Sequence, residues 1–162
     1  MSRFLETHQL VSAFVPVDMQ TAANNGDWVS LVNYNRVLCV LFKGAGTAGD
    51  DPVFTLQQAQ DASGTGATDL DFTTIYSKVG TQTSINPFTV TTQSAANTYT
   101  DATSAEVQAM IAVEISAPML DDGFTHVRMT IPDTGGNAQL GCGFYILSEP
   151  RSEGVTMPSA IA

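Results

Sequence analysis

The sequence predicts an all-β protein, a single β-sandwich or jelly-roll-like domain with extended N- and C-terminal arms. About eight or nine short runs of apolar or alternating residues recur at regular spacing, and clusters of Gly, Pro, Asn, Asp and Ser separate them. The sequence has no long amphipathic helical pattern, and 162 residues fit one domain. We expect an N-terminal arm or short helix at 1–10, the β-sandwich at 11–148 and a C-terminal arm at 149–162.

Four strands are expected in the first half of the chain. Residues 10–17 are mostly apolar, and Pro16 places this strand at a sheet edge or a bulge because proline lacks a backbone donor. Residues 28–34 alternate in polarity. Residues 36–43, "RVLCVLFK", are apolar on both faces, as in a central strand that is covered on two sides. Residues 53–60 form the fourth strand, after a long glycine-containing turn.

The third quarter of the chain is less regular. Residues 70–78 predict a strand, and 79–104, rich in Thr, Ser, Gln and Asn, predict one or two weak strands. Residues 103–116 allow one helical turn but favour a strand, because Ile, Val and Ile alternate with smaller or polar residues near its end. One face of the 70–78 strand is expected to carry Leu70, Phe72, Thr74 and Tyr76.

The clearest strand signal lies at 121–133, where a strict alternation runs between Asp-Gly and Pro. The residues expected to point inward are Val127, Met129 and Ile131. The residues expected to point outward are His126, Arg128 and Thr130. The last strand is expected at 138–149.

Composition excludes several classes of partner. The chain has 6 Lys plus Arg against 16 Asp plus Glu, a net charge of −10, which argues against nucleic acid and anionic membranes. Charged residues make up 14%, below the usual quarter, and a mildly polar surface is typical of a protein that meets neighbours. No run approaches the length of a membrane span.

The two cysteines, Cys39 and Cys142, are expected to be buried free thiols, because both lie in apolar runs. A disulfide between them is the alternative. The chain starts without a signal-peptide pattern, so we expect synthesis in a reducing cytoplasm.

No catalytic, cofactor-binding or metal-binding residue is predicted, and we expect a protein that is not an enzyme. The only histidines, His8 and His126, have no partner pattern for general-base or nucleophilic chemistry, and the acidic pairs suit turns better than metal loops. The rival interpretation is a carbohydrate-binding or glycan-active β-sandwich. It would use Trp28, Tyr76 or Tyr99 as a stacking platform beside a loop aspartate.

Candidate interface residues lie in two kinds of place. Gly141 and Gly143 share a strand face, and such glycines fit either a neighbouring subunit or an aromatic ring of the same chain. The two termini are expected to contact a partner protein, although the tail instead folding back over its own sandwich is a second hypothesis. The terminal candidates are Phe4, Leu5, Arg151, Met157, Pro158 and Ile161.

Three stretches, 15–67, 70–80 and 123–151, combine "NYNRV", "GTAGDDP" and a closing "YILSEPR". In this combination the chain resembles small virion proteins encoded beside the major capsid gene in tailed bacteriophages. The resemblance implies a head decoration or cement protein on the outer capsid surface, made in the host bacterial cytoplasm. Its implied partners are the major capsid protein and copies of itself, in a homotrimer. A tail or head-completion component is the alternative within the virion, and the resemblance carries over no catalytic residues.

Overall fold

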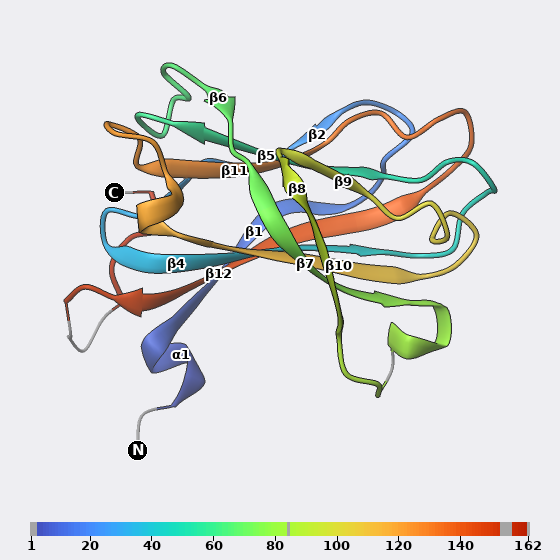
Figure 1. Cartoon of the computed structure of the whole chain (residues 1–162), viewed down its shortest axis with the longest axis horizontal. Coiled ribbons are helices and arrows are strands. Elements are labelled where there is room, and N and C mark those ends of the chain that lie inside the picture. The colour runs from blue at the N-terminus through green and yellow to red at the C-terminus, as the bar shows by residue number, and fades with distance from the viewer. Residues whose placement is uncertain (1–2, 84, 153–156, 162) are drawn as a thin grey trace.

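The computed structural model describes residues 3–83, 85–152 and 157–161, and these fold as two antiparallel β-sheets in a sandwich-like arrangement (Figure 1). The prediction of an all-β sandwich is confirmed. Short helical segments accompany the strands, and these are α1 (Phe4–Thr7), η1 (Gly80–Thr83) and η2 (Ala117–Met119).

We call the two sheets A and B. In spatial order, sheet A consists of β1 (His8–Asp18), β12 (Leu140–Pro150), β4 (Tyr34–Lys43), β10 (Ala109–Ser116), β7 (Phe72–Val79) and β8 (Thr89–Ala96). Sheet B consists of β2 (Asn24–Asn25), β11 (His126–Ile131), β5 (Val53–Ala59) and β6 (Thr68–Asp69), with β3 (Val29–Ser30) paired to β11 and β9 (Thr98–Thr100) to β5. Strands from the two ends of the chain therefore lie side by side in sheet A.

The strand positions in sheet A follow from the sequence. β1 is an edge strand, and its register shifts between Phe14 and Val17, which is where Pro16 was expected to cause a bulge. β4 is central, hydrogen-bonded to β12 on one side and β10 on the other, as its apolar sequence predicted. β1 begins at His8 and β12 ends at Pro150, so the sheet reaches slightly beyond 11–148.

The core lies between the inner faces of the two sheets. Alternate residues of β4 and β10 meet those of β11 and β5, and burying such side chains is the main stabilising contribution to a sandwich. As predicted for β11, Val127, Met129 and Ile131 point inward and are fully buried. From the facing sheet come Val37, Cys39, Leu41, Ile111, Val113 and Ile115.

The turn from sheet B into sheet A alters the expected alternation. β6 pairs with β5 in sheet B and β7 pairs with β10 in sheet A, and a register shift separates Phe72 from Thr74. The prediction that Leu70, Phe72, Thr74 and Tyr76 share one face was wrong, because the burial pattern of β7 changes phase at the register shift, where β8 has two more residues than β7 between the paired positions Phe72–Ala96 and Thr74–Thr92. After it, Ile75 is fully buried and Tyr76 is turned away from the core.

A buried lysine holds the loop that precedes β10. Lys43 is 1% exposed, and its Nζ donates to the carbonyls of Ser104 at 2.5 Å, Ala105 at 3.3 Å and Val107 at 2.6 Å. Burial lowers the pKa of Lys43, while the charges of Asp51 and Asp101 act in the opposite direction. Residues 101–107 form hydrogen-bonded turns, and the strand favoured for this region is β10.

Candidate protein–protein interaction surface

The outer face of sheet A, the side turned away from sheet B, carries apolar residues. On β4, Val37, Cys39 and Leu41 belong to the core, so the alternate residues Leu38, Val40 and Phe42 point to the opposite side. The same alternation on β12 and β10 places further apolar side chains on this outer side. The face is therefore built by strands that are apolar at both sets of alternating positions.

Cross-strand register arranges these outward residues in three rows, which together we call the apolar face. The central row is Ser12, Phe144, Val40, Ala112, Tyr76 and Val90. On one side of it lies the row Cys142, Phe42, Met110 and Lys78. On the other side lies the row Leu10, Ile146, Leu38 and Glu114.

Exposure varies systematically over the apolar face. Val40 and Ala112, in the middle, are only 3% and 2% exposed. Toward the margins, Leu10 and Val90 are each 57% exposed and Phe42 is 39% exposed. Water therefore reaches apolar side chains mainly at the margins of the face, on β1, β4 and β8, around a centre that is already buried. Monomeric soluble proteins rarely expose large patches of this kind.

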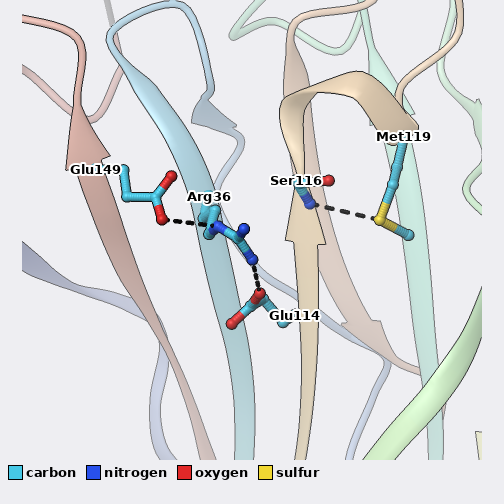
Figure 2. A network of polar contacts seen from close by, with 5 residues as sticks. All are labelled: Arg36, Glu114, Ser116, Met119 and Glu149. Carbon is cyan, nitrogen blue, oxygen red and sulfur yellow. Dashed lines mark hydrogen bonds and ion pairs between the residues drawn. The ribbon is translucent and has the colours of Figure 1, made fainter.

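The few charges near the apolar face are mostly paired. Arg36 donates from Nη1 to Glu114 and from Nε to Oε1 of Glu149 at 2.9 Å (Figure 2). Glu149 has a φ of 55°, unusual for a residue other than glycine, which interrupts the alternation of β12 and lets its carboxylate reach Arg36. Hydrogen bonding to Glu114 is the largest of the effects that raise the pKa of Arg36. At the opposite side of the sheet, Lys78 Nζ lies 4.7 Å from the centre of the Phe88 ring.

The N-terminal candidates lie beside this face. Phe4 and Leu5, in α1, are 57% and 66% exposed. The Phe4 ring stacks on His8 with 4.1 Å between ring centroids, and His8 points to the same side of β1 as Leu10. Phe4 therefore adjoins the apolar face at the N-terminal end of β1, where Figure 1 shows α1 projecting from the sandwich.

The strand glycines face the core of their own chain. A Cβ built on Gly143 would lie 2.5 Å from Cε1 of Phe14, and one on Gly141 would lie 2.8 Å from Sδ of Met19. Both glycines are buried on the inner side of β12. The hypothesis of a neighbouring subunit at Gly141 and Gly143 was wrong, since a ring of the same chain, Phe14, takes that space at Gly143.

The C-terminal tail returns to the sandwich. Tyr34 donates its hydroxyl to the carbonyl of Pro158 at 2.7 Å, the Ser30 amide donates to the carbonyl of Ala160 at 2.7 Å, and Met157 packs against the core. The expectation that Met157 and Pro158 serve a partner is corrected, because long-range contacts absent from local sequence patterns tie them to their own domain. Arg151 and Ile161 remain exposed. Residues 153–156 lie outside the described part of the chain.

The residues of the carbohydrate hypothesis do not gather in one exposed platform. Trp28 is 7% exposed, and the guanidinium carbon of Arg128 lies 4.5 Å from the centre of its ring. Tyr99 packs against the core, and Tyr76 lies in the apolar face. A stacking platform needs an accessible ring, and Trp28 does not offer one.

His126 was predicted to point to solvent, and this was wrong. It is 4% exposed, and its Nδ1 lies 2.9 Å from Oγ1 of Thr125, whose hydroxyl also donates to the Gln60 carbonyl. Burial lowers the pKa of His126, with the charge of Asp61 acting in the opposite direction. The turn after β5 covers this outer side of sheet B, a tertiary contact that strand alternation does not indicate.

Both cysteines are free thiols, as predicted, but only Cys39 is buried as expected. Cys39 is fully buried in the core, while Cys142 lies in the apolar face and is half-buried. Burial raises the pKa of both thiols. The two side chains point to opposite sides of sheet A, because Cys142 shares the outward row of Phe42 whereas Cys39 belongs to the core.

Within the described residues, no group of three or more His, Cys, Asp or Glu side chains is placed to hold a metal ion. No helix in the same part of the chain has the length and apolar character needed to cross a membrane. Scans against models of known protein families and searches of curated proteins and of solved structures find no match for this chain.

The residues of the apolar face were largely missed from the sequence. The available signal was the 36–43 segment, which is apolar on both faces and was interpreted as a strand covered on two sides. The structure supplies one cover, sheet B, on the side of Leu41. On the side of Phe42 the apolar residues face solvent.

Proposed function

We propose that this chain is a structural virion protein that decorates and stabilises a phage capsid through protein–protein contacts, with no catalytic activity of its own. The observation that carries the proposal is the apolar face, a binding surface built into the stable part of the fold. The resemblance of 15–67, 70–80 and 123–151 to small phage virion proteins supports the virion setting. The proposed partners are the major capsid protein and further copies of this chain.

Physical chemistry favours a protein partner for the apolar face. Removing apolar surface from water contributes roughly 25 cal/mol per Å², so a face spanning a whole sheet supplies substantial binding energy. The net charge of −10 disfavours nucleic acid and anionic lipid as partners. The carbohydrate alternative is weakened because Trp28, its strongest stacking candidate, is buried beneath Arg128.

The test is the copy number of this protein in purified virus particles. Quantitative mass spectrometry against the major capsid protein should give a ratio near one chain per capsid subunit or a simple fraction of it. A few copies per particle would instead indicate a tail or head-completion component. Absence from purified particles would contradict the virion proposal.

A further inference from the structure

We propose that the occupant of the apolar face is a second copy of the same chain, with sheet A of one molecule packed against sheet A of another around a two-fold axis. This inference rests on the proposed function in taking the face as a protein contact, and it goes further by naming the partner. It differs from the homotrimer implied by the resemblance. When the apolar face packs on the same face of a second copy, one contact covers the whole surface, and the assembly is complete with two subunits.

The distribution of charge selects an identical partner. The cations on or beside the three rows are Arg36 and Lys78, and the anions are Glu114 and Glu149, so two positive charges balance two negative ones, with one further anion, Asp18, opposite Leu140 at the end of β1. The chain as a whole carries −10, and that excess therefore lies elsewhere. Two copies of an acidic protein repel each other least when they approach through this nearly neutral side.

The shape of the apolar face also suits contact with a second copy of the same face. Its centre is formed by the small side chains of Val40 and Ala112, and larger ones, Phe144, Phe42 and Tyr76, surround them. A two-fold axis near the centre would place these small residues opposite their own copies, and the surrounding aromatic side chains of the two molecules would meet around the axis. Sheets with the same twist pack face to face in this way, about 10 Å apart.

The extent of the face matches a modest specific interface. Strands about 4.8 Å apart and rows about 6.6 Å apart give a flat area on the order of 500 Å². Leu140 at one end, 63% exposed, and Phe4 and Leu5 beside β1 enlarge it. Specific interfaces begin at roughly 600 Å² per partner. The face is therefore large enough for a dimer that dissociates on dilution.

The first experiment measures the mass of the full-length protein in solution by light scattering across a concentration series. We expect a dimer that dissociates on dilution, and a monomer at every concentration for Phe42→Asp. Ile85→Asp is the matched control, because Ile85 is an exposed apolar residue, 92% accessible, outside the face. It should remain dimeric. Circular dichroism and thermal melting establish that each variant is folded.

The second measurement uses the native thiols. Cys142 lies in the face next to Phe42, whereas Cys39 is sealed in the core and serves as an internal silent reference. The rate of Cys142 modification by a soluble disulfide reagent should fall as wild-type concentration rises, and should be independent of concentration in Phe42→Asp.

Three results would overturn the inference: a wild-type protein that is monomeric at high micromolar concentration, a trimer, or a Phe42→Asp variant that still dimerises. A monomeric wild type whose binding to particles is lost in Phe42→Asp would assign the face to the capsid protein, keeping the proposed function and removing the second copy. A confirmed dimer that is absent from particles would remove the virion function and leave the self-contact standing.

Discussion

The outer faces of the two sheets differ in how far other parts of the same chain cover them. On sheet B, Arg128 donates to Oε1 of Gln57 at 2.6 Å and lies over Trp28, and the turn after β5 packs alongside, with Gly64 against the Trp28 ring. On sheet A, the corresponding positions hold Leu38, Phe42 and other apolar side chains that contact water. The difference teaches that side chains and a turn of the same chain cover the outer face of sheet B, whereas apolar side chains on the outer face of sheet A stay open to water.

The largest expected effect separates the two sides of β4. Leu41→Ala removes a fully buried core side chain and should lower the free energy of unfolding by about 2–5 kcal/mol. Phe42→Ala, one residue further along on the apolar face, should lower it by less than about 1 kcal/mol in dilute monomer. Urea denaturation of both variants measures the contrast. Equal losses would mean that the outer face is as closely packed as the core.

The next effect tests which side Gly143 serves. Gly143→Ala places a methyl group against Phe14 inside the sandwich and should cost about 1–3 kcal/mol of stability. Gly136→Ala is the control, since a Cβ there meets no atom within 4 Å. Denaturation midpoints give the comparison. A Gly143→Ala protein of normal stability and altered oligomeric mass would mean that Gly143 lies in a contact between subunits.

A smaller effect is expected from the tail. Deleting 157–162 removes the hydrogen bonds to Tyr34 and Ser30 and the packing of Met157, and should cost about 1–2 kcal/mol. At about 2–4 °C per kcal/mol for a domain of this size, the melting temperature should fall by several degrees. Ile161→Ala, which changes an exposed side chain, should leave it unchanged. Normal thermal stability of the truncated protein would mean that the tail contributes nothing to the sandwich.

The smallest effect concerns His126, on the outer face of sheet B. Burial depresses the pKa of His126, so the folded state resists protonation while the unfolded state takes up a proton below its ordinary value of 6.5. Stability should therefore decline as the pH falls below about 6.5 and be independent of this group above it. His126→Gln should reduce that decline, as measured by unfolding free energies at a series of pH values. An unchanged pH profile would show that His126 titrates alike in both states.

Alternation of residue type predicted the strands that pack directly on the core. In β11, Val127, Met129 and Ile131 are buried because one face of the strand meets sheet A. The sequence indicates this face because apolar and polar residues alternate at every second position. The register shift after Phe72 was not predictable in this way, since the alternation of β7 changes phase there without any change in residue type. The strands could be predicted from the sequence because the alternation of residue type depends only on neighbouring positions in the chain.

The candidate site was harder to predict because its causes are long-range. The contact between Tyr34 and Pro158 joins positions far apart in the chain, so the tail looked unattached in sequence. The two-sided apolar character of 36–43 was visible, but the sequence does not distinguish cover by the same chain from cover by another. The sequence thus showed that Leu38 and Phe42 are apolar, but it did not predict that they belong to an exposed surface.

The pairing of β1 with β12 has a consequence for how the protein folds. β1 ends at Asp18, yet its neighbour in sheet A, β12, begins only at Leu140 (Figure 1). Sheet A therefore closes through a contact between strands that are far apart in the chain. Such non-local closure slows folding. Until it occurs, apolar residues of β4 lack their neighbour β12 and stay accessible, which exposes the incompletely folded chain to aggregation.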